Sequence, residues 1–204
     1  MRTGILGGTF DPIHVAHLHT ADCALHQLRL DRVLIVPAGD PWQKAGDPIS
    51  PAADRLELCR LAVADADGIE VDDREIRRGG STYTIDTLAS FPEDEDLFLI
   101  MGSDALAGLR SWRRWQEVVA RVTVVVAPRP GSHPDGPELE GSIALDMALL
   151  EISGTDIRRR AREGRPFRYL VTEPVFSYIK DNNLYTNATG DDMVVSLNNT
   201  EEAS

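Results

Sequence analysis

The segment Thr3-Gly-Ile-Leu-Gly-Gly-Thr-Phe-Asp-Pro-Ile-His-Val-Ala-His17 contains an apolar run, a glycine-rich turn and two histidines, one after another. The apolar run at 3–6 predicts a β-strand, and apolar residues at helical intervals predict a helix over 15–28. The turn then lies at the C-terminal end of the first strand, where small residues let a ligand approach the backbone and helix N–H groups favour phosphate. The segment therefore predicts an α/β fold with an anion-binding turn.

Further apolar runs recur along the chain, with helical patterns between them. They occupy residues 32–37, 69–71, 97–101, 122–127 and 144–152. Several are short and rich in Val, Ile and Leu, as expected for strands that are covered on both faces. The pattern predicts an α/β protein with a Rossmann-like, doubly wound parallel sheet.

The segments between these runs carry helix signals. Ser50 followed by Pro51 is typical of an N-cap and first turn, for a helix that runs to about residue 64. Later helices are predicted over 83–90, 112–119, 156–163 and 173–181. The last two predict a small helical C-terminal subdomain at about 153–186, within a single domain of residues 1–186.

Composition sets the broad class of the protein. The chain has 204 residues, 42% of them hydrophobic, and can bury one substantial core. It has no apolar stretch of membrane-spanning length and no signal peptide, so we expect a cytoplasmic protein without a membrane partner. Cys23 and Cys59 lack metal-ligand spacing and are expected to be buried. Residues 187–204 are polar and acidic, which predicts a disordered tail.

Charge argues against a nucleic-acid partner. The formal net charge is −12, whereas binding a polyphosphate backbone relies on clustered Lys and Arg. A locally positive stretch is still available, formed by Arg158, Arg159, Arg160, Arg162, Arg165 and Arg168. It either binds an anionic small substrate or is a solvated basic helix face, and the sequence leaves both interpretations open.

The glycine-rich turn matches neither the G-x-G-x-x-G pattern nor the G-x-x-x-x-G-K-[ST] pattern, so other groups must hold a phosphate there. His14 and His17 are three residues apart and share a face of the predicted helix, where two imidazoles can donate hydrogen bonds to one phosphate. Two structural histidines are the alternative. His19 points to a different side of the helix from His17, which disfavours a zinc site, and we assign no metal ligand.

Residues 7–17, G-G-T-F-D-P-I-H-V-A-H, resemble the signature of the bacterial nicotinate mononucleotide adenylyltransferases, in the HxGH nucleotidyltransferase superfamily. Later segments resemble further motifs of that family in order: P-A-G-D-P-W-Q-K at 37–44, S-T-Y-T at 81–84, D-T-L at 86–88, G-S-D at 102–104, Trp112, R-P-G at 129–131 and I-S-G-T-D-I-R at 152–158. The ending at 169–185 is also similar, so the likeness covers about residues 1–186. Ala16 stands where the family usually has glycine, and Gly154 where it usually has serine or threonine.

The resemblance implies adenylyl transfer from ATP to nicotinate mononucleotide, giving nicotinate adenine dinucleotide and pyrophosphate, with Mg²⁺ accompanying ATP. It implies that His14, His17 and Arg158 are catalytic. The implied ATP-binding residues are Gly7, Gly8, Thr9, Phe10, His14, His17, Gly102, Asp104, Ile152, Ser153 and Arg158. The partners are then the two nucleotides, and a homo-oligomer is compatible with the sequence.

The resemblance also implies residues for the mononucleotide: Lys44, Thr84, Asp104 and Trp112. The Trp112 ring would stack on the pyridine, Thr84 would meet its carboxylate, and Asp104 would bind a ribose hydroxyl or position magnesium. Local sequence leaves other interpretations open, with Trp112 in the core, Asp104 as a helix N-cap and Lys44 as a loop residue. Ser153 or Thr155 is expected to cap the helix that carries Arg158.

The mechanism follows from the substrates, because a mononucleotide phosphate is mostly dianionic at neutral pH and needs no general base. We expect in-line attack on the α-phosphorus of ATP, with catalysis by positioning and charge stabilisation. Phosphopantetheine adenylyltransferase is the enzymatic alternative, although it does not account for residues 81–84 or Trp112. A catalytically silent nucleotide sensor is the alternative from another class. Preference for the nicotinate over the nicotinamide mononucleotide is not readable from side chains.

Overall fold

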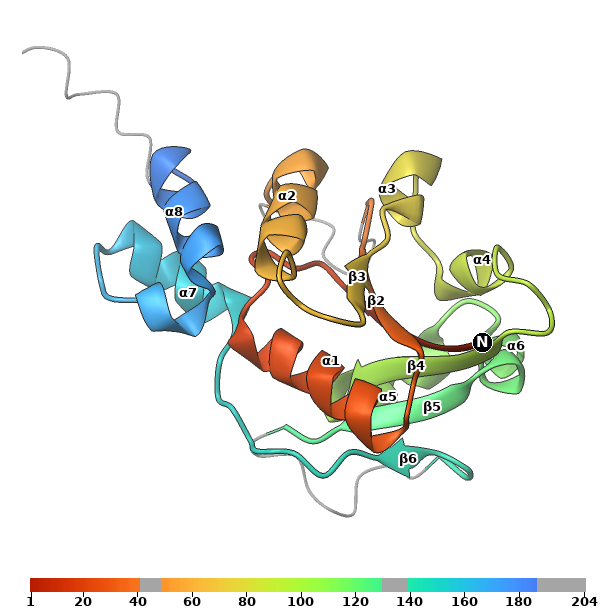
Figure 1. Cartoon of the computed structure of the whole chain (residues 1–204). Helices are drawn as coiled ribbons and strands as arrows, with labels where there is room; N and C mark the ends of the chain where they lie inside the picture. Colours follow the sequence, from red (N-terminus) through yellow and green to blue (C-terminus); the bar gives the residue numbers. More distant parts are fainter. Residues whose placement is uncertain (41–48, 130–138, 187–204) are drawn as a thin grey trace, which may run out of the picture.

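The computed structural model describes residues 1–40, 49–129 and 139–186, and its centre is a six-stranded sheet (Figure 1). The strands are β1 (Arg2–Gly8), β2 (Arg32–Pro37), β3 (Ile69–Val71), β4 (Asp96–Gly102), β5 (Thr123–Ala127) and β6 (Ile143–Ala144). Their order in the sheet is β3-β2-β1-β4-β5-β6, and all neighbouring pairs are parallel. This order is that of a doubly wound sheet, so the predicted fold class is confirmed.

The last predicted strand is mostly wrong. Only Ile143–Ala144 pairs with β5, and the Leu145 N–H closes the ladder on the Val126 carbonyl at 2.9 Å. Beyond that point the chain leaves the sheet, and Leu149 is 55% exposed. The apolar side chains of Met147, Leu150 and Ile152 instead form part of a cavity wall, which explains why the run resembles a strand without being one.

The helices are α1 (Val15–Gln27), α2 (Ala52–Ala62), α3 (Arg74–Arg78), α4 (Thr84–Leu88), α5 (Ser103–Gly108), α6 (Trp115–Arg121), α7 (Gly154–Arg162) and α8 (Glu173–Asp181). Two 3₁₀ turns, η2 (Leu109–Ser111) and η3 (Arg168–Leu170), complete the set among these residues. Three predicted starts need correction. The N-cap position of α2 is Pro51 rather than Ser50, and Trp112 precedes α6 because it ends η2. The helix predicted from residue 156 begins at Gly154.

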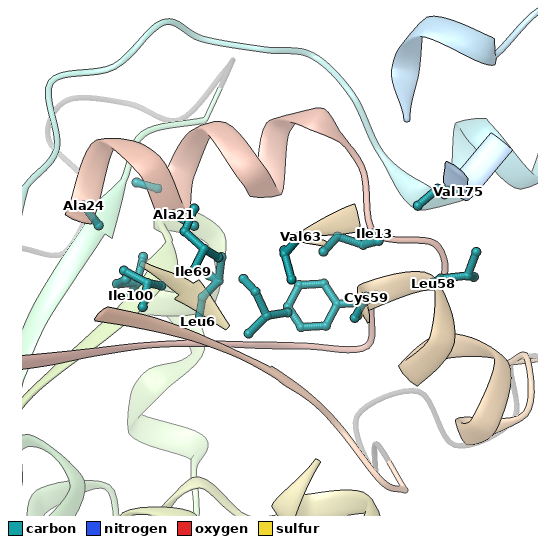
Figure 2. Packing of buried hydrophobic residues seen from close by; sticks show 14 of the residues in the cluster. Leu6, Ile13, Ala21, Ala24, Leu58, Cys59, Val63, Ile69, Ile100 and Val175 are labelled. Carbon is teal, nitrogen blue, oxygen red and sulfur yellow. The ribbon is translucent and has the colours of Figure 1, made fainter. Parts of the chain in front are cut away.

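The helices cover both faces of the sheet. One core joins α1 and α2 to the strands, and Figure 2 shows Ala21 beside Leu6 and Ile69 of that face, with Val63 and Cys59 in the same cluster. The opposite core joins α4 and α6 to the strands. Cys59 is fully buried as predicted, but Cys23 is only partly buried and packs against the margin of the same core.

The C-terminal helices extend the first core. Val175 of α8 belongs to the same buried cluster, and α8 packs beside α2 (Figure 1). The Tyr178 hydroxyl donates a hydrogen bond to Asp54 Oδ1 of α2 at 2.9 Å. Residues 153–186 are therefore attached to the sheet domain by apolar and polar contacts. Within the described ranges, no helix combines the length and the apolar character needed to cross a membrane.

The strand order reverses between β1 and β4, because the chain builds β1, β2 and β3 outward in one direction and β4 to β6 in the other. Gly8 ends β1 and Gly102 ends β4 at the same edge of the sheet. In open α/β sheets, ligands bind outside the carboxyl ends of the strands at such a reversal. The fold therefore directs attention to the edge that carries the glycine-rich turn.

Candidate active site

Two adjoining cavities open at this edge. The first, which we call the α4-side cavity, has a volume of about 430 Å³ and runs from the glycine-rich turn to α4 and Trp112. The second, the β5-side cavity, has a volume of about 660 Å³ and lies between the start of α1, the end of β5 and residues 147–153. Both are lined by Leu6, His14, His17, Gly102, Arg129 and Ser153. A ligand in one cavity is thus contiguous with a ligand in the other.

The glycine-rich turn is compact because an aromatic ring folds back over it. Phe10 has a positive φ of 49° and is 3% exposed. A Cβ on Gly8 would lie 2.9 Å from Phe10 Cζ, so a larger residue at that position would displace the ring. The compact turn leaves Gly7, Gly8 and Thr9 in the wall of the α4-side cavity.

His14 and His17 form a stacked pair at the start of α1. His14 occupies the N-cap position, and the two ring centroids are 3.7 Å apart with an interplanar angle of 21°. The His14 backbone N–H donates to His17 Nδ1 at 3.3 Å, which places the proton of a neutral His17 ring on Nε2. The edge of Phe10 packs against His17 with centroids 5.0 Å apart. The rings are therefore held in one orientation beside the turn.

The His14 side chain is neutral at neutral pH. It is 4% exposed, and burial, aided by the positive charge of Arg129, lowers its pKa to about 4. Among the described residues, no group makes a hydrogen bond to its buried Nδ1 atom. Because buried polar atoms in native proteins nearly always have a partner, this atom in a cavity wall indicates a ligand or water position.

Asp11 connects the turn to three other parts of the chain. Its Oδ1 atom accepts a hydrogen bond from the Tyr185 hydroxyl at 2.8 Å, and its Oδ2 atom accepts one from the Ser50 N–H at 3.2 Å. Its backbone carbonyl accepts one from Arg158 Nη1 at 2.6 Å. Burial and the Asp11 carboxylate raise the pKa of the Tyr185 phenol, so it stays protonated and donates. Sequence reasoning missed Asp11 and Tyr185.

Arg55 is a third residue that sequence reasoning missed. It is 1% exposed, and its guanidinium donates to the carbonyls of Thr9 at 2.8 Å, Gly39 at 3.0 Å and Ser50 at 3.1 Å. It therefore joins the loop after β1 to the loop after β2. The available signal was an arginine on the same helical face as Leu58, where an apolar residue is expected.

The N-terminus of α7 approaches the turn closely. The Ser153 Oγ atom accepts from the Asp156 N–H at 3.2 Å, so Ser153 is the predicted cap and Thr155 is not. A Cβ on Gly154 would lie 2.7 Å from the Asp11 carbonyl oxygen. Gly154 therefore permits the close approach by which Arg158 reaches Asp11. Its structural role is this close backbone approach, and the hydroxyl of the usual serine or threonine is not all that distinguishes it.

Most of the arginine-rich stretch is a basic surface. Arg159 and Arg160 pair with Asp156, while Arg165 pairs with Glu163 and Arg168 with Glu173. Only Arg158 and Arg160 of the stretch line a cavity among the residues the structure describes. The other arginines of the stretch therefore form a solvated basic face. Arg158 and Arg160 are the two side chains that remain candidates for an anion site.

Asp104 lies in the first turn of α5. The N-cap position of that helix is Gly102, so the N-cap interpretation of Asp104 is wrong. Asp104 Oδ1 lies 3.1 Å from Arg129 Nε, and both side chains are about half exposed or more at the cavity mouth. A Cβ on Gly102 would come close to Asp104 Oδ1 and within 2.8 Å of Arg129 Nε, so a larger residue there would shift this ion pair.

The far end of the α4-side cavity is aromatic and polar. Thr84 begins α4, Trp112 ends η2, and both line the cavity. Trp112 also packs against the core, so its two interpretations are compatible. The Arg113 guanidinium carbon lies 4.7 Å from the centroid of the Tyr83 ring, and both residues belong to the same wall. Lys44 lies outside the described residues.

The described site residues that the sequence predicts lie in these two walls. Those of the α4-side cavity are Gly7, Gly8, Thr9, Phe10, His14, His17, Thr84, Gly102, Asp104, Trp112, Ser153 and Arg158. Ile152 lines the β5-side cavity alone. Segments spread from residue 7 to residue 158 thus converge on one connected site.

Comparison with known proteins gives consistent results. The profile of the cytidylyltransferase-like family matches residues 5–160. A probable nicotinate-nucleotide adenylyltransferase of Dehalococcoides mccartyi is 41% identical over 198 residues, covering 91% of this chain and 97% of the relative. A probable nicotinate-nucleotide adenylyltransferase of a Roseiflexus species is 44% identical over 192 residues, covering 89% of this chain and 96% of the relative. A solved structure of Plasmodium falciparum nicotinic acid mononucleotide adenylyltransferase complexed with NaAD shares the fold, with a TM-score of 0.77, 16% identity and coverage of 90% and 97%.

Proposed function

The chain belongs to the cytidylyltransferase-like family and, within it, to the nicotinate-nucleotide adenylyltransferases, and from this premise we propose that it transfers the adenylyl group of ATP to nicotinate mononucleotide. The products are nicotinate adenine dinucleotide and pyrophosphate. One observation carries the proposal for this chain: two cavities share a wall of stacked histidines at the strand-order reversal. Such a site suits two nucleotides that must meet at their phosphates.

Each cavity suits one nucleotide. We propose that the ATP phosphates lie against the glycine-rich turn, between His14, His17 and Arg158, with the adenosine beside Ile152 and Ser153 in the β5-side cavity. The pyridine nucleotide then occupies the α4-side cavity, where the Trp112 ring and Thr84 form the far wall. The shared wall supports this arrangement, because it brings the acceptor phosphate next to the α-phosphorus of ATP.

The reaction requires no protein nucleophile. An oxygen of the dianionic mononucleotide phosphate forms a bond to the α-phosphorus, while the bond from that phosphorus to the bridging oxygen breaks and pyrophosphate leaves with the electron pair. His17 and Arg158 donate hydrogen bonds to the phosphate oxygens on which charge accumulates. Asp11 and Arg55 act as positioning residues, because they hold the turn and the Arg158 side chain.

Magnesium is proposed to accompany ATP. In the described parts of the chain, no three His, Cys, Asp or Glu side chains are grouped as a metal site. Mg²⁺ is commonly held by one or two carboxylates together with substrate phosphates, so the cavity suits a metal that arrives with the nucleotide. Asp104 is the exposed carboxylate of the wall and would provide the protein ligand. The ion would neutralise phosphate charge.

The remaining predictions concern organisation. We keep residues 1–186 as one domain, with 153–186 as its helical C-terminal part, and this is supported by the contacts of α8 with α2. The tail at 187–204 lies outside the described residues. Cytoplasmic location and a homo-oligomer stay predictions.

The proposal is tested by measuring pyrophosphate release with ATP and magnesium in the presence of one acceptor at a time. Nicotinate mononucleotide, nicotinamide mononucleotide and phosphopantetheine are supplied separately. We expect release with nicotinate mononucleotide and none above background with phosphopantetheine. Release with phosphopantetheine alone would identify the alternative enzyme, and tight ATP binding without release for any acceptor would identify a nucleotide sensor.

A further inference from the structure

The α4-side cavity contains three arginines, and they are not equivalent. Arg129 lies 3.1 Å from Asp104, and Arg158 donates to the Asp11 carbonyl and lies 4.0 Å from its carboxylate. For Arg113, no carboxylate of the described residues lies within 4.0 Å of the guanidinium. Among the three arginines of this wall, Arg113 is therefore the one that forms no ion pair with a described carboxylate.

The position of this cation is defined by an aromatic neighbour. The Arg113 guanidinium carbon lies 4.7 Å from the Tyr83 ring centroid, a cation–π geometry that holds a flexible side chain over the ring. Tyr83 is followed by Thr84, and Arg113 follows Trp112, so these four residues form one end of the cavity. A planar ring stacked near Trp112 would have a fixed positive charge beside it.

We propose that Arg113 determines the specificity of the acceptor site by binding a carboxylate on the pyridine ring of the mononucleotide. This inference rests on the proposed function and adds the residue that selects the acid. A guanidinium and a carboxylate form two parallel charge-assisted hydrogen bonds, whereas a neutral carboxamide gains no ionic attraction. The ring acid would thus balance the charge of Arg113.

The other charged groups of the wall do not serve this role. Arg129 and Arg158 lie with Asp104 and Asp11 at the phosphate end, where the negative charge of ATP is proposed to bind. Glu75 also lines the cavity, but its Oε1 atom accepts a hydrogen bond from the Thr87 hydroxyl at 2.5 Å, and burial raises its pKa, which favours the neutral acid. Arg113 is left as the partner for a ring carboxylate.

The test compares kcat/KM for the nicotinate and nicotinamide mononucleotides in the full chain and in Arg113→Gln. We expect the unmodified protein to prefer the acid. In Arg113→Gln, we expect kcat/KM for the acid to fall about tenfold to hundredfold, mainly through KM, with the amide within about twofold of the unmodified protein. Arg113→Lys keeps the charge and should restore part of the preference.

Arg110→Gln is the matched control, because Arg110 is an exposed arginine of η2 that lines neither cavity. It should leave the acid-to-amide ratio unchanged. An unchanged ratio in Arg113→Gln, or an equal loss for both acceptors, would overturn the inference while leaving the proposed function intact. Absence of release by the unmodified protein with either pyridine nucleotide would instead reject the proposed function, and the inference with it.

Discussion

His17→Ala is expected to lower kcat for dinucleotide formation by roughly 10²–10³-fold, the usual loss when one preorganised donor to a developing charge is removed. The His14 N–H holds the His17 ring through Nδ1, which puts the ring proton on Nε2. The stacked His14 ring and the edge of Phe10 fix the orientation of that N–H beside the turn. Turnover under saturating substrates measures the loss.

The same variant should fold nearly as well as the unmodified protein. The deleted contacts include one ring stack, one edge contact and the hydrogen bond from the His14 N–H, each worth about 1 kcal/mol. A thermal melt beside the kinetics separates the two effects. His26→Ala is the control from the same helix, since its side chain is 73% exposed and should leave both quantities unchanged. Near-normal turnover in a folded His17→Ala protein would show that His17 is structural.

His14 is expected to make the protein acid-sensitive. Its pKa is about 4 in the folded protein against an ordinary value of 6.5, chiefly because the ring is buried. The unfolded chain therefore binds the proton more readily. The contribution of the neutral His14 ring to the stability of the folded protein is fully present above about pH 6.5, and it is lost as the pH falls toward 4. Between pH 7 and pH 5 this one residue should remove about 2 kcal/mol from the free energy of unfolding.

Denaturant unfolding at pH 7 and pH 5 tests this value. The unmodified protein should lose about 2 kcal/mol more between the two pH values than His14→Gln, whatever the stability of the variant at pH 7. His26→Gln removes an exposed histidine of the same helix and should follow the unmodified protein. Equal losses in the unmodified protein and in His14→Gln would mean that the His14 ring is readily protonated in the folded state.

The sheet was predictable because its strands are buried on both faces. Four residues in a row are buried in β1, and five in β2 and β4, so these stretches are apolar except for Thr3, whose hydroxyl donates to Glu95 Oε1. The run at 144–152 was wrongly predicted as a strand because its apolar residues have another role. Met147, Leu150 and Ile152 of this run line a cavity, and composition alone does not distinguish a ligand wall from a strand.

The positioning residues were not predictable, because their partners are distant in sequence. The hydrogen bond from Arg55 to Thr9 spans 46 positions, that from Arg158 to Asp11 spans 147, and that from Tyr185 to Asp11 spans 174. Nothing in local spacing indicates such pairs. Asp11 lies inside the quoted signature and still carried no separate signal, because its role depends on elements that only the fold brings together.

Gly154 shows how a sequence departure can mislead. Seen as a missing hydroxyl, it suggests a weakened phosphate contact. In the structure its Cα faces the Asp11 carbonyl so closely that a Cβ would lie 2.7 Å from the oxygen. The residue thus sets the distance between α7 and the turn, which is a backbone property that the side-chain pattern does not express.

The most direct measurement follows ATP labelled at the α-phosphate in a reaction with nicotinate mononucleotide and magnesium. We predict that the label appears in nicotinate adenine dinucleotide in step with unlabelled pyrophosphate, and that no label becomes attached to the protein, since attack is direct. Label attached to the protein as an intermediate, or transfer of the γ-phosphate to the mononucleotide instead, would contradict direct adenylyl transfer at this site.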